Sequence, residues 1–180
     1  MPPITPRQFW DLYRETLRLK GSWLAYESDR TWSPIALGAA EESCEKMGLK
    51  TQRENLRLDV MGYDSRSRFD WDLRVAFEHE NLDDWKDELC KLTHVVADLC
   101  VLASYHNFNS AEPLSSVLQA ALDKIEFSVR NRRVMERQWL FIFGPRCVCA
   151  DHAFQALTLD PQGKVADLED AKPLTPKSWQ

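Results

Sequence analysis

The stretch of sequence that decides the fold runs from Arg57 to Asn81 and reads RLDVMGYD, SRSR, FD and WDLRVAFEHEN. Apolar and polar residues alternate on both sides of the polar segment Ser65–Arg68, which is the period of half-buried strands. The pattern therefore predicts two adjacent strands, paired as a hairpin.

Three carboxylates occupy special positions in this predicted hairpin. Asp59 lies inside the first strand, and Glu78 and Glu80 share one face at the end of the second, because side chains two residues apart in a strand point the same way. Crowded carboxylates repel each other unless water or a cation neutralises them, and a hard divalent ion prefers oxygen ligands. The alternative is a solvated sheet face, although strands tend to avoid Asp and the residues before Glu78 are apolar.

The remaining pattern predicts an α/β fold. Capping hydroxyls followed by proline predict helices that begin at Thr5 and Ser33 and end near Lys20 and Met47. Further helices are expected over 82–97 and 114–133, buried strands over 99–105 and 138–144, and a late hairpin over 153–159 and 163–168. A helical connection between two buried strands implies parallel pairing, so we expect a central mixed β-sheet flanked by helices.

No linker divides the chain, so we expect residues 1–180 to form a single domain. Its expected parts are an extra N-terminal helical extension (1–32), a core (33–144), a C-terminal hairpin (145–169) and a tail rich in Pro and Lys that frays (170–180).

Composition bounds the class of protein. The chain is 44% hydrophobic and 28% charged, and it has no apolar run near the roughly 20 residues that a membrane span needs. The N-terminus lacks the layout of a signal peptide, and five scattered cysteines indicate reduced thiols in a cytoplasmic protein. A net charge of −5 argues against a protein that coats nucleic acid, but an acidic nuclease site can coexist with a basic rim.

The order of elements after Ser33, with Asp59 on one strand and Glu78-x-Glu80 on the next, resembles the restriction-endonuclease-like superfamily of PD-(D/E)xK nucleases. The resemblance covers roughly residues 33–144. It implies a Mg²⁺- or Mn²⁺-dependent nuclease that hydrolyses phosphodiester bonds, and DNA rather than RNA is the expected substrate. It also implies that Asp59 and Glu78 hold the metal.

The motif departs from the family pattern at its third position, where Glu80 replaces the usual lysine. As a third carboxylate, Glu80 would strengthen metal binding or recruit a second metal. A catalytic lysine could come instead from the next helix, as Lys86 or Lys91, and Lys91 is preferred if its helical face turns toward the strand ends. In this family the first core helix often adds another acid, for which the candidates are Glu41, Glu42 and Glu45.

Two other clusters carry weaker signals. Arg130, Arg132 and Arg133 are candidates for contacting DNA phosphates, although stabilising a helix C-terminus would also explain them. The segment from Cys147 to His152 lacks the Cys-x-x-Cys knuckle of zinc sites, so zinc is disfavoured.

A second function class stays open at this point. The chain could be a non-catalytic member of the same fold that acts as a protein-interaction or assembly module, as the missing lysine and the net acidity suggest. Exposed apolar surface on residues 1–32 would then mark a partner or homodimer interface.

Overall fold

The computed structural model describes residues 3–67, 70–81, 85–108, 112–129, 137–146, 152–175 and 179. Its elements, in chain order, are α1 (Pro6–Lys20), α2 (Trp23–Tyr26), α3 (Asp29–Lys46), β1 (Lys50–Asn55), β2 (Leu58–Ser67), β3 (Asp70–His79), α4 (Trp85–Thr93), β4 (Leu99–His106), α5 (Leu114–Val129), β5 (Gln138–Pro145), β6 (Gln155–Leu159) and β7 (Val165–Asp167).

The strands form one mixed sheet in the order β1-β2-β3-β4-β5-β6-β7. The pairs β3/β4 and β4/β5 are parallel, and the other four pairs are antiparallel. The parallel pairs are those joined by α4 and α5, because a helical crossover returns the chain to the same end of the sheet. The α/β prediction, with a mixed sheet and N-terminal helices, is therefore confirmed.

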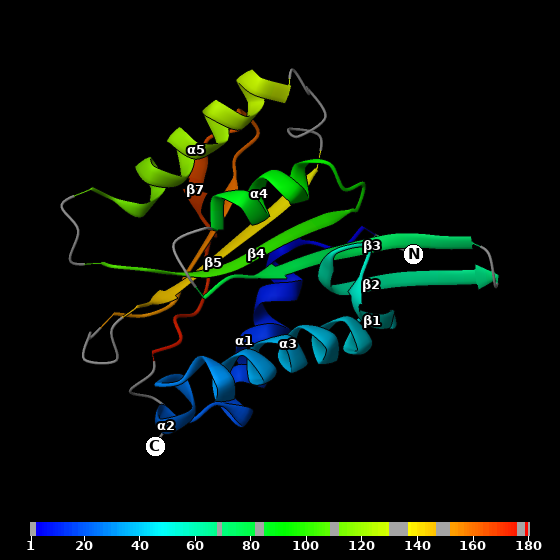
Figure 1. Ribbon diagram of the computed structural model, residues 1–180, viewed down its shortest axis with the longest axis horizontal. Coiled ribbons are helices and arrows are strands. Elements are labelled where there is room, and N and C mark those ends of the chain that lie inside the picture. Colours follow the sequence, from blue (N-terminus) through cyan, green and yellow to red (C-terminus); the bar gives the residue numbers. More distant parts are fainter. Residues whose placement is uncertain are drawn as a thin grey trace.

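Helices cover both faces of the sheet, with α1 and α3 on one face and α4 and α5 on the other (Figure 1). Alternate strand residues supply the two cores. The core under α1 and α3 contains Val60, Phe77, Val101 and Ile142, and the core under α4 and α5 contains Met61, Ala76, Leu102 and Phe141. On β3, Ala76 and Glu78 consequently lie on the face toward α4.

Two boundaries in the N-terminal half differ from the sequence prediction. Helix α3 begins at Asp29, so the predicted start at Ser33 is wrong and Pro34 lies inside the helix. Strand β1 was not predicted because its sequence, KTQREN, is polar; it lies at the edge of the sheet, where most of its side chains are exposed.

The C-terminal half also differs in detail. Helix α4 ends at Thr93, before the predicted end at residue 97, and Val96 beyond it is exposed. The tail predicted to fray is packed instead: Leu174 pairs with Phe154 in an isolated bridge, and Trp179 is buried against Tyr26 and Trp32. Two large apolar side chains outweigh the local preference of Pro and Lys for irregular structure.

Two glycines allow a test of the packing. A Cβ at Gly144 would lie 2.6 Å from Phe154 Cε1 and 2.8 Å from the Tyr26 hydroxyl, whereas a Cβ at Gly38, within α3, would meet only Arg53 Nη2 at 3.6 Å. We expect Gly144→Ala to lower the free energy of unfolding by about 1–3 kcal/mol through overpacking. Gly38→Ala should raise it by about 0.5–1 kcal/mol through helix propensity. Urea unfolding of the two variants checks both signs.

Candidate functional site

Asp59 and Glu78 lie side by side on β2 and β3. Val60 pairs with Phe77 in the antiparallel register, so the next pair along the ladder is Asp59 with Glu78. The backbone N–H of His79 donates to Asp59 Oδ2 at 2.8 Å. This hydrogen bond fixes the Asp59 carboxylate beside the point where β3 ends, which is where the sequence places the candidate site.

Glu78 is an acidic side chain inside the protein. Its side chain is 1% exposed. Within the described residues, Glu78 Oε1 lies 2.9 Å from Lys91 Nζ, and Glu78 Oε2 has no hydrogen-bond partner. Burial is the main cause that raises the pKa of Glu78 to about 8. The hydrogen bond and charge of Lys91 oppose this shift, and the charges of Asp59 and Glu88 add to it. Burial also raises the pKa of Asp59, against the effect of the His79 N–H. A buried, poorly satisfied carboxyl with a strongly shifted pKa is typical of functional sites.

Lys91 is the cation that meets this pair. Its Nζ lies 2.9 Å from Glu78 Oε1, donates to the backbone oxygen of Arg57 at 2.9 Å, and forms an ion pair with Glu88 Oε2. Helix α4 brings Lys91 here because it packs over the face of β3 that carries Ala76 and Glu78. Of the two lysines considered from sequence, Lys91 therefore reaches the acidic pair, while Lys86 lies over the ring of Trp85, 5.7 Å from its centroid.

The turn between β1 and β2 has unusual backbone geometry. Leu56 and Arg57 join the paired residues Asn55 and Leu58, and their φ angles are 52° and 63°. A two-residue hairpin turn with two positive φ angles normally contains Asn and Gly, so Leu and Arg here are strained. The strained turn directs the Arg57 carbonyl to Lys91.

Glu88 was not predicted from the sequence, and Glu80 does not complete the metal-binding cluster that the sequence predicted. Glu88 precedes Lys91 by one helical turn and pairs with it, a spacing that the sequence itself shows. Glu80 lies beyond the end of β3, where its backbone N–H donates to Ala103 and its carbonyl accepts from Ser104. Among the described residues, no group of three or more His, Cys, Asp or Glu side chains is placed to hold a metal ion, so Asp59, Glu78 and Glu80 do not form the expected three-ligand cluster.

Two carboxylates remain available to a cation. Mg²⁺ is commonly held by one or two protein carboxylates together with waters and substrate phosphates, and it does not require a full protein cage. Asp59 and Glu78 meet that requirement. Lys91 Nζ already lies 2.9 Å from Glu78 Oε1, and Glu78 Oε2 has no hydrogen-bond partner among the described residues. The residues present therefore fit a Mg²⁺ ion held by two carboxylates.

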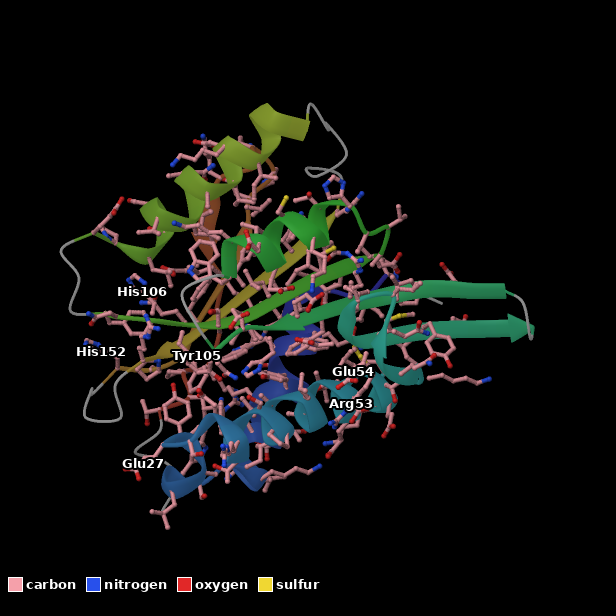
Figure 2. All side chains as sticks on the ribbon, in the orientation of Figure 1. Glu27, Arg53, Glu54, Tyr105, His106 and His152 are labelled. Carbon is pink, nitrogen blue, oxygen red and sulfur yellow. The ribbon has the colours of Figure 1, made fainter. Side chains whose placement is uncertain are left out.

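The acids predicted from the first core helix are occupied elsewhere. Glu41 pairs with Arg53, Glu42 pairs with Lys20 and Lys46, and Glu45 accepts from Thr51. Helix α3 covers the face opposite α4, and Figure 2 shows Arg53 between β1 and α3. None of the three acids is brought to Asp59 and Glu78 by these contacts.

Other predicted residues fall outside the described part of the chain. Arg130, Arg132, Arg133, Cys147, Cys149 and Asp151 belong to that group. The nearby Arg137 is described, and it donates to the carbonyls of Leu92 and Thr93 at the end of α4.

On the opposite face of β3, His79 is part of a buried hydrogen-bonded chain. Trp32 Nε1 donates to the Tyr105 hydroxyl, and that hydroxyl lies 2.8 Å from His79 Nε2. Burial lowers the pKa of His79 to about 4, so the ring is neutral. His79 is therefore a packed residue, and its backbone N–H connects this hydrogen-bonded chain to Asp59.

No protein-family model matches the chain, and no curated protein matches it as a relative. Within the described residues, no helix is long and apolar enough to cross a membrane.

Proposed function

We propose that the protein is a divalent-metal-dependent phosphodiesterase with a restriction-endonuclease-like core, acting on DNA. The observation that carries the proposal is the juxtaposition of Asp59, the buried Glu78 and Lys91 at the end of β3. The family pattern combines two acids with a lysine, and here the lysine comes from α4, because Glu80 occupies its usual place in the sequence.

The chemistry divides between the ion and the side chains. When bound, Mg²⁺ polarises the scissile phosphate and lowers the pKa of a coordinated water. Asp59 and Glu78 would hold the ion, the His79 N–H keeps Asp59 oriented, and Lys91 presents a positive charge where the phosphate's negative charge increases. The site is therefore suited to hydrolysis of an anionic ester.

The test is cleavage of plasmid DNA, single-stranded DNA and RNA, with Mg²⁺ or Mn²⁺ and with EDTA. We expect metal-dependent cleavage of at least one DNA substrate that EDTA stops. A folded protein that leaves all three substrates intact and binds neither metal would contradict the proposal.

A second candidate is a non-catalytic interaction module. Two apolar side chains near the N-terminus favour it: Leu19 on α1 is 64% exposed and Leu24 on α2 is 78% exposed. The Lys91 ion pairs would then serve as a structural lock between α4 and the sheet. Sedimentation of the wild type beside a Leu19→Ser, Leu24→Ser double variant would reveal a self-association that depends on this surface.

A further inference from the structure

The ammonium group of Lys91 is held by oxygens from three different parts of the fold. Its partners are the Arg57 carbonyl in the β1–β2 turn, the Glu78 carboxyl on β3 and the Glu88 carboxyl on α4. An ammonium has three N–H donors, so three oxygen partners can use all of them. The group thus occupies the place of a bound cation next to Glu78.

A divalent ion on Glu78 and the ammonium in its present place would repel each other. Like charges a few ångströms apart are costly in a partly buried site, where screening by water is weak. Because Lys91 lies 2.9 Å from Glu78 Oε1, a second cation on that oxygen requires the ammonium to withdraw.

Glu88 can hold the ammonium after it withdraws from Glu78. It lies one turn before Lys91 on α4, so their pairing does not depend on β3. The Glu88 side chain is 22% exposed and that of Lys91 is 32% exposed, whereas Glu78 is nearly inaccessible. The more accessible carboxylate can therefore follow the lysine as it moves outward.

We propose that Lys91 and the divalent metal alternate as the cation on Glu78, and that Glu88 is a positioning residue that keeps the Lys91 ammonium beside the site while the metal is bound. This inference rests on the metal site of the proposed function. It predicts that metal binding changes the surroundings of Lys91 in the absence of any substrate.

The experiment is amine-reactive labelling of the wild-type protein, read by mass spectrometry, with and without saturating Mg²⁺ at matched ionic strength. Metal binding is measured separately by calorimetry. We expect labelling of Lys91 to rise several-fold with Mg²⁺, because the ammonium loses an oxygen partner and becomes more accessible. Lys86, which lies over Trp85, and Lys46, which is paired with Glu42, are internal controls and should not change.

Two variants separate the roles of the carboxylates. Glu88→Gln should enlarge the Mg²⁺ effect on Lys91, because nothing then retains the displaced ammonium. Glu78→Gln should give high labelling that Mg²⁺ does not alter. The comparison of the wild type with and without metal requires no variant. A folding defect in Glu88→Gln or Glu78→Gln therefore leaves this test intact.

The possible failures are distinguishable. If calorimetry shows Mg²⁺ binding that Glu78→Gln removes, while labelling of Lys91 stays constant, the alternation is wrong and the proposed function stands. If no metal binds and no substrate is cleaved, the proposed function and this inference both fall.

Discussion

Asp59→Ala is expected to abolish metal-dependent cleavage, with a loss of at least roughly a hundredfold. Losing one of two carboxylate ligands removes several kcal/mol of electrostatic stabilisation of the transition state, and each 1.36 kcal/mol corresponds to a factor of ten in rate. Glu78→Gln should have a similar effect, because an amide provides no negative charge. The measurement is the initial rate of DNA cleavage in Mg²⁺ at equal protein concentration.

Folding should survive Asp59→Ala. The His79 N–H loses its acceptor, which costs about 1–3 kcal/mol, but repulsion between Asp59 and Glu78 also disappears. Circular dichroism and thermal unfolding of the Asp59→Ala variant, measured beside the cleavage rate, show whether it is folded.

Two further acids serve as controls. Asp64→Ala changes an acid on the same strand, farther from the site, and should leave the rate near the wild-type value. Glu80→Gln should lose much less activity than Glu78→Gln, because Glu80 does not join a three-ligand cluster. Wild-type rates in Asp59→Ala, with cleavage still stopped by EDTA, would place the metal elsewhere in the protein.

The sheet was predictable wherever burial imposes a pattern on the sequence. Strands β4 and β5 are almost fully buried, so their continuous apolar runs identify them. Strand β1 has the opposite character: an edge strand with exposed side chains needs no apolar pattern. The packing of Trp179 in the tail depends on a pocket formed by residues more than a hundred positions away, which local sequence cannot reveal.

The candidate site was predictable in part for similar reasons. Strand register follows from alternation, so the adjacency of Asp59 and Glu78 could be inferred. The position of Lys91 depends on the rotation of α4 about its axis, which tertiary packing decides. Glu88 could have been found only after Lys91 was placed, by looking one helical turn before it.

Glu78→Gln is expected to change how the stability of the metal-free protein depends on pH. The folded-state pKa of Glu78 is about 8, against a usual value near 4.5 in the unfolded chain. Between these values the folded state keeps a proton that the unfolded state has lost, so the free energy of unfolding falls as pH rises through this window. With 1.36 kcal/mol per unit of pKa, the wild type should lose roughly 3–5 kcal/mol relative to the variant between pH 4.5 and pH 8.

Glutamine at position 78 is the appropriate replacement because a neutral amide resembles the protonated carboxyl in size and charge. The variant should therefore match the wild type near pH 4.5 and exceed it in stability near pH 8. Urea unfolding in EDTA at several pH values measures the difference directly. If the stability of the wild type and of Glu78→Gln depended on pH in the same way, the pKa of Glu78 in the folded protein would be close to its usual value.

The stabilisation of the folded protein by Mg²⁺ at pH 8 should also depend on Glu78. At pH 8 in the absence of metal, Glu78 is partly ionised inside the protein with only Lys91 to offset its charge. A ligand that binds only the folded state adds stability that grows with its concentration. Mg²⁺ should therefore stabilise the wild type at pH 8 and have little effect on Glu78→Gln. Equal stabilisation of both proteins would show that the ion binds at a site other than Glu78, whatever the outcome of the cleavage assay.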